Sequence, residues 1–93
     1  MDTVQLDGHA LDAITLATPN TKILVIRAPR GILGCGYISL ETAAKVGDAL
    51  AVVSGVSNYE EMLAAPVKAV SPAAEALGIR PGMTGRDVLE KMI

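Results

Sequence analysis

The sequence predicts a mixed α/β domain, in which an N-terminal antiparallel β-meander continues into a mixed sheet with three to four short helices. Residues 1–38 consist of alternating or β-branched apolar runs separated by turn residues, as in strands. From Ser39 onward, apolar residues recur at helical spacing between further short apolar runs. A length of 93 residues fits a single domain, with 1–38 as a β-rich part and 39–93 as an alternating helix and strand part.

The first part contains signals for four strands joined by tight turns. Asp7-Gly8 is the two-residue signal of a type I′ hairpin between the first strand and a second one that ends at about Leu16. The third strand is expected at Lys22–Arg27 and the fourth at Ile32–Ile38. Connections this short favour antiparallel neighbours, because a parallel neighbour needs a crossover of a dozen or more residues.

Helix caps and helix stops mark the second part. Ser39 is expected to cap a helix that Gly47 ends, and Ser57-x-x-Glu60 has the spacing of a capping box. Because the first of these helices lies between two strands, we expect a βαβ crossover there. The expected elements are helices after Ser39, Ser57, Ser71 and Thr84, and strands at Ala49–Val53 and Val67–Val70.

The composition favours self-association. Hydrophobic residues make up 51% of the chain, although it has neither Phe nor Trp, and a domain this small has little interior in which to bury them. No apolar run reaches the roughly 18–20 residues of a spanning helix, and the N-terminus lacks the layout of a signal peptide. We therefore expect a cytoplasmic homo-oligomer rather than a membrane protein, and the single cysteine fits a reducing compartment.

The charge pattern argues against several classes of partner. A net charge of −2 without a basic stripe, and with two tyrosines as the only aromatic residues, disfavours binding to nucleic acid. One Cys and one His cannot close a zinc site within one chain. The glycines from Gly31 to Gly36 match neither the dinucleotide fingerprint nor a P-loop, so no cofactor is predicted.

Cys35 is the candidate catalytic residue, flanked by Gly34, Gly36 and Tyr37 as candidate ligand-binding residues. Two interpretations remain open. Free cysteine is among the most buried residue types, so Cys35 is either a small core residue or a reactive thiol. A reactive thiol would need a cationic or basic partner, and Arg30 and His9 are the candidates if folding brings them close.

A second candidate site is the start of the last helix, at Thr84, Gly85 and Arg86. Free amides at a helix N-terminus together with an arginine can bind a small anionic ligand such as a carboxylate or phosphate. The structural alternative is that Thr84 caps the helix and Asp87 occupies the third helical position.

At Gly31–Ile38 and Gly78–Arg86, and also at Ala44–Ala49 and Val53–Val56, the chain resembles the YunC-like family, domain of unknown function 1805. The resemblance implies a β-rich N-terminal region that mediates tetramer formation, followed by an α/β part, and it implies no reaction. The function expected is that of a homo-oligomeric binding or regulatory module. The alternative is a thiol-dependent enzyme or sensor that uses Cys35 at a site shared between subunits.

Overall fold

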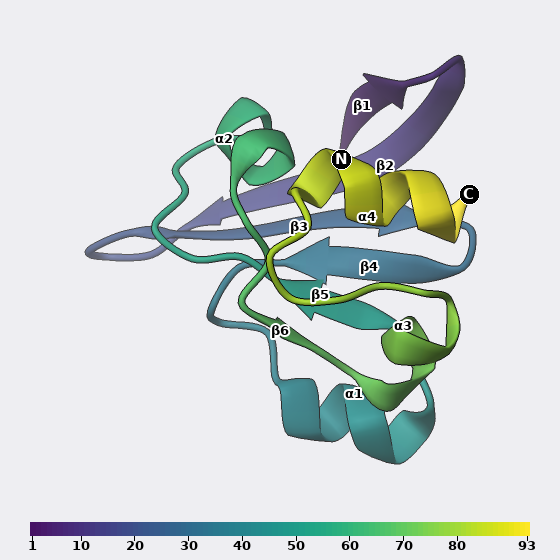
Figure 1. Ribbon diagram of the computed structural model, residues 1–93. Coiled ribbons are helices and arrows are strands. Elements are labelled where there is room, and N and C mark those ends of the chain that lie inside the picture. Colours follow the sequence, from purple (N-terminus) through teal and green to yellow (C-terminus); the bar gives the residue numbers. More distant parts are fainter.

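A computed structural model describes all residues, 1–93, as one six-stranded sheet with four helices (Figure 1). The strands follow one another across the sheet in chain order, from β1 to β6. Neighbours are antiparallel except for β4 and β5, which are parallel and joined by α1. The predicted meander, crossover and mixed sheet are therefore confirmed. The elements are β1 Asp2–Leu6, β2 His9–Ala17, β3 Lys22–Ala28, β4 Gly31–Gly34, α1 Leu40–Val46, β5 Leu50–Val52, α2 Tyr59–Ala64, β6 Ala69–Val70, α3 Pro72–Ala76 and α4 Gly85–Met92.

Turn and cap residues act where the sequence predicted them, with the exception of the cap of α2. Asp7 and Gly8 both have positive φ, 50° and 82°, as a type I′ hairpin requires. The side chain of Ser39 accepts a hydrogen bond from the Thr42 amide, and Gly47 ends α1 in the left-handed conformation. Side chains also cap α3 and α4 at the predicted serine and threonine.

The cap of α2 lies one residue later than predicted. Asn58 is the N-cap, and its side-chain oxygen accepts a hydrogen bond of 2.8 Å from the Glu61 amide. The Glu61 side chain in turn accepts a hydrogen bond of 2.7 Å from the amide of Ser57. Asn58 and Glu61 therefore replace the predicted Ser57 and Glu60. The pair resembles a capping box, except that Glu61 accepts from the amide before the cap residue.

The fourth strand is shorter than predicted. It ends at Gly34, and the next residues turn, with the Ile38 amide donating to the Cys35 carbonyl over 3.0 Å. Ile38 then folds back over Gly34: a Cβ on Gly34 would come within 2.7 Å of that side chain. Cys35 therefore follows the strand instead of lying inside it, and the expectation of a strand to Ile38 is wrong.

Helices cover the two faces of the sheet unequally. On one face α4 packs against β4 and α2, and the main core gathers Leu33, Met62 and Leu89 there. Leu50, on β5, is also fully buried but lies outside this core, on the face that α1 contacts. None of the helices has the length and hydropathy needed to cross a membrane.

The part of the second face formed by β2 and β3 carries apolar side chains without a helix over them. Ile14 and Leu16 are 47% and 59% exposed. Beside them, Arg27 and Asp12 form an exposed ion pair across the two strands, with 2.6 Å between nitrogen and oxygen. This surface, called the open face below, therefore combines apolar residues with both signs of charge.

Candidate functional site

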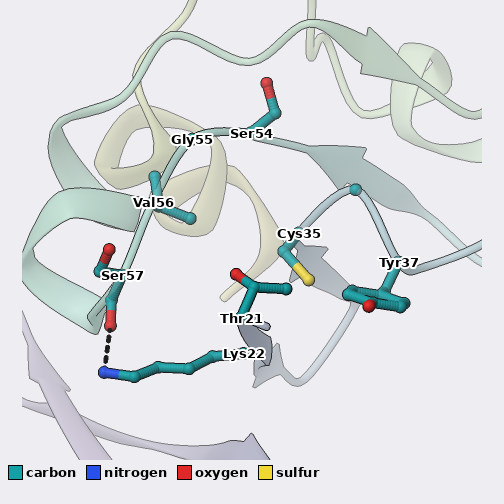
Figure 2. Close-up of a pocket in the computed structure, with 9 residues that line it drawn as sticks. Thr21, Lys22, Cys35, Tyr37, Ser54, Gly55, Val56 and Ser57 are labelled. Carbon is teal, nitrogen blue, oxygen red and sulfur yellow. Dashed lines mark hydrogen bonds between the residues drawn. The ribbon is translucent and has the colours of Figure 1, made fainter. Parts of the chain in front are cut away.

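A pocket of about 480 Å³ lies beyond the carboxyl ends of β4 and β5. Its walls are the end of the β2–β3 hairpin, the loop from β4 to α1 and the loop from β5 to α2 (Figure 2). The carboxyl ends of parallel strands are where ligands bind in open α/β sheets, because the chain leaves both strands there as loops. The lining residues are Thr21, Lys22, Cys35, Gly36, Tyr37, Ser54, Gly55, Val56 and Ser57.

Cys35 contributes its sulfur to this pocket while most of its side chain is buried. Only 6% of the residue is exposed. The Cys35 amide donates a hydrogen bond of 3.0 Å to the Leu24 carbonyl, and the Leu24 amide donates one of 3.3 Å to the Cys35 Sγ atom. Figure 2 shows the sulfur directed toward the space between Thr21 and Tyr37. Cys35 is thus both a buried residue and a pocket-lining one, so the two interpretations of this cysteine do not exclude each other.

Lys22 is the one charged residue that lines the pocket. Its ammonium group donates to the carbonyl oxygen of Ser57 over 3.2 Å, and it forms no ion pair with any carboxylate. The β2–β3 hairpin brings it to residues 35 positions further along the chain. Sequence reasoning missed this residue, because nothing local distinguishes it from any other lysine at the start of a strand.

Both strand-end loops offer backbone donors. The amides of Gly36 and Tyr37, in the loop after β4, donate no hydrogen bond within the chain. The same holds for the amides of Ser54–Val56, in the loop after β5. A pocket that combines unpartnered amides, hydroxyl groups and one ammonium group has the donors that an anion requires.

Close packing explains two of the three glycines in the Gly31–Gly36 stretch, but not the third. A Cβ on Gly31 would lie 2.8 Å from the Ala49 carbonyl oxygen and from Met92, so close packing explains this glycine as it explains Gly34. A Cβ on Gly36 would meet no atom within 4 Å, and Gly36 does not have positive φ. Neither packing nor backbone conformation within the chain accounts for a glycine at this pocket position.

Neither predicted partner of Cys35 is near it within the chain. His9 is exposed, begins β2 and lies by the Ala28–Pro29 end of β3, whereas Cys35 is near the other end of that strand. Arg30 is in the β3–β4 turn at the same far end, where its side chain donates to the Lys91 carbonyl over 2.7 Å. The structure therefore assembles no Cys-His or Cys-Arg pair in a single chain.

The predicted anion site at the start of α4 is occupied by the chain's own groups. Thr84 accepts from the Asp87 amide, which confirms the capping interpretation. The buried Gly85 donates its amide to the Ala65 carbonyl over 3.0 Å, and a Cβ there would clash with the Met62 carbonyl. Close contact between α4 and α2 thus explains Gly85.

Arg86 points away from the pocket, toward the β1–β2 turn. Its guanidinium lies 3.5 Å from an oxygen of Asp7, and both side chains are about half exposed. A hydrogen bond with Asp7 raises the pKa of Glu90 above its ordinary value, and desolvation adds to the shift. The contact between Arg86 and Asp7 joins the β1–β2 turn to α4 and is not part of the pocket.

The two tyrosines lie in different surroundings. Tyr37 is 58% exposed and stands at the rim of the pocket. Tyr59, at the start of α2, donates to the Asp2 carboxylate over 2.6 Å and accepts from Thr15 over 2.8 Å. Burial and the bond to Asp2 raise the pKa of Tyr59 above its ordinary value, against a smaller opposing effect of Thr15. This network fixes the helix that follows the pocket loop.

Comparison with known proteins confirms the resemblance seen in the sequence. The model of a family described as a domain of unknown function (DUF1805) matches residues 34–92. The chain is 31% identical over 94 residues to the Uncharacterized protein YunC of Bacillus subtilis (strain 168), with 97% of this chain and 93% of that protein covered. It also resembles the crystal structure of a protein of unknown function, TA1206, from Thermoplasma acidophilum, with a TM-score of 0.93 and 34% identity over 99% of this chain and 90% of that one.

Proposed function

From the premise that this chain belongs to the DUF1805 family, we propose that it is a small homo-oligomeric binding module that holds a small anionic ligand in the pocket beside Cys35. The observation that carries the proposal is the charge of the pocket. Lys22 contributes a positive charge that forms no ion pair with a carboxylate, and none of the other lining residues is charged. A site of this kind attracts anions and repels cations.

The size and position of the pocket support the same proposal. A volume of about 480 Å³ lies within the range of roughly 300–1,000 Å³ typical of small-molecule sites. Two loops and a hairpin from three separate parts of the chain converge there. Binding residues commonly lie on loops that a rigid scaffold positions, as the sheet does here.

Self-association is the second part of the proposal. The open face exposes Ile14 and Leu16 beside the Asp12–Arg27 pair, so two copies can place apolar residues together and exchange opposite charges. The apolar composition of the chain supports the same conclusion, because little of the surface of such a small domain can be hidden internally. A tetramer is the assembly that the family resemblance favours.

Titration of isotope-labelled protein by NMR tests the binding proposal. Inorganic phosphate and succinate serve as probes, with sodium chloride at matched ionic strength as the reference. We expect at least one probe to shift the amide resonances of Gly36, Tyr37 and Gly55, and Lys22→Met to weaken that binding about tenfold. Lys45→Met, which removes the same charge from α1, should bind as the wild type does. If neither probe shifts the pocket resonances beyond chloride, the proposal is wrong.

The second candidate function is a thiol-dependent enzyme or sensor that uses Cys35 at a site shared between subunits. The position of Cys35 in the pocket wall favours it, with its sulfur directed toward the space between Thr21 and Tyr37, since a reactive thiol must be within reach of its substrate. Iodoacetamide labelling of the folded protein near neutral pH provides the test. This function predicts faster labelling of Cys35 than of N-acetylcysteine. Absence of labelling without denaturant would exclude it.

A further inference from the structure

The backbone of the pocket wall formed by Ser54–Ser57 is hydrogen-bonded at its two ends, and between them the half-buried Val56 packs against the core. At one end the Val53 amide donates a hydrogen bond of 2.9 Å to the Gly34 carbonyl, and at the other end the Ser57 amide donates one to the Glu61 side chain. Between them, the amides of residues 54–56 donate no hydrogen bond. Gly55 has φ of 71°, and a Cβ there would meet nothing within 4 Å. A short segment with these properties can move between two fixed points.

One further hydrogen bond holds this wall, and it comes from the β2–β3 hairpin. Lys22 donates to the Ser57 carbonyl over 3.2 Å, as the dashed line in Figure 2 shows. An ammonium group has three N–H donors, and this bond is the only one that the Lys22 ammonium makes within the chain. The acceptor is a neutral carbonyl, which is a weaker partner for a cation than an oxyanion is.

We propose that the ligand's anionic group is an oxyanion, a carboxylate or a phosphate, that takes the place of the Ser57 carbonyl on Lys22 and thereby releases the 54–57 wall. Lys22 is then a latch as well as a binding group. In the empty pocket it ties the β2–β3 hairpin to the wall, and in the occupied pocket it turns its N–H donors to the ligand. The inference rests on the proposed function, and it adds the class of ligand and the response of the protein to it.

The unpartnered amides explain why release of the wall does not simply open the pocket. The amides of Ser54–Val56, Gly36 and Tyr37 belong to the loops that line the pocket, and they donate no hydrogen bond within the chain before or after Ser57 leaves Lys22. The energy of the new charge-assisted bonds drives the exchange, because each replaces a bond to a neutral group or to water. A ligand with no negative charge lacks this driving force and leaves the latch closed.

The Ser57 carbonyl reports on the latch directly, through its ¹³C chemical shift and independently of binding affinity. In the absence of phosphate, Lys22→Met should change this shift and lower the backbone order parameter of Gly55, whereas Lys45→Met should change neither. In the wild type, saturation with inorganic phosphate should move the Ser57 carbonyl resonance toward its position in Lys22→Met. Succinate in place of phosphate distinguishes a carboxylate from a phosphate preference.

The outcomes separate the two proposals. If Lys22→Met leaves Ser57 and Gly55 unchanged in the absence of phosphate, there is no latch, whatever the pocket binds. If phosphate or succinate binds in the pocket while the Ser57 carbonyl resonance stays in place, the exchange is wrong and the binding function stands. If the latch responds to the substitution but neither anion shifts any pocket resonance, the binding function fails and the ligand-driven release fails with it.

Discussion

Leu24 and Cys35 are joined by hydrogen bonds in both directions, and only one of the two depends on a side chain. The Cys35 amide bonds to the Leu24 carbonyl at 3.0 Å, and the Leu24 amide bonds to the Cys35 sulfur at 3.3 Å. Both residues are buried. The sulfur therefore serves as the acceptor for a main-chain donor that water cannot reach, in addition to lining the pocket.

Replacing this sulfur should reveal its structural role. We expect Cys35→Ala to lower the free energy of unfolding by about 1–3 kcal/mol, because it leaves the buried Leu24 amide without an acceptor. Cys35→Ser should cost less, since a hydroxyl oxygen can still accept. Urea denaturation of the two variants measures the difference, and an alanine variant as stable as the wild type would contradict it.

Gly34 and Gly36 should respond to substitution in opposite ways. Gly36→Val adds side-chain atoms at a pocket position where a Cβ has no neighbour, so we expect unfolding free energy within about 0.5 kcal/mol of the wild type and weaker phosphate binding. Gly34→Ala forces a Cβ against Ile38 and should cost about 1–3 kcal/mol. Thermal melts and NMR titration measure both. Full phosphate affinity in Gly36→Val would place the ligand elsewhere.

Stability at alkaline pH should depend on Tyr59. Its pKa is raised in the folded state, so the contribution of this group is fully present below the ordinary tyrosine pKa of about 10 and is lost as pH rises through the folded value. Unfolding free energies measured across this range should therefore fall less steeply in Tyr59→Phe than in the wild type. Equal slopes in Tyr59→Phe and the wild type would contradict the prediction.

The open face should mediate self-association. Light scattering coupled to size-exclusion chromatography is expected to give several times the chain mass of 9.6 kDa for the wild type. Ile14→Glu combined with Leu16→Glu should reduce that mass, because the substitutions bury charge at the contact. Val46→Glu changes an exposed apolar residue on α1 and is the control. A wild-type monomer at micromolar concentration would contradict the prediction.

Local chemistry made much of this fold predictable. The Asp7-Gly8 turn, the Ser39 cap and the Gly47 stop each act through residues a few positions away, so the sequence pattern is sufficient to place them. The end of β4 was not predictable in this way. It depends on how the Ile38 side chain packs over Gly34, and apolar continuity alone made the strand seem longer.

The site was harder to predict because its parts come from distant segments. Cys35 and Tyr37 drew attention as a local motif and do line the pocket. Lys22 reaches Ser57 across 35 positions, and no spacing rule relates the two. Gly85 is the opposite case, because the sequence predicted a binding role that the structure does not support. It lies in a stretch that fits an anion site, but close contact with the Met62 carbonyl of α2 is what requires a glycine there.

The two borders of the sheet are unequal, which limits how copies can join through main-chain pairing. β1 has five residues, whereas β6 has only two and is too short to pair stably with a strand of another molecule. A fibril that grows strand by strand must use both borders of every molecule. Because β6 is too short to serve as the second border, pairing between two β1 strands forms a closed dimer that cannot extend into a fibril.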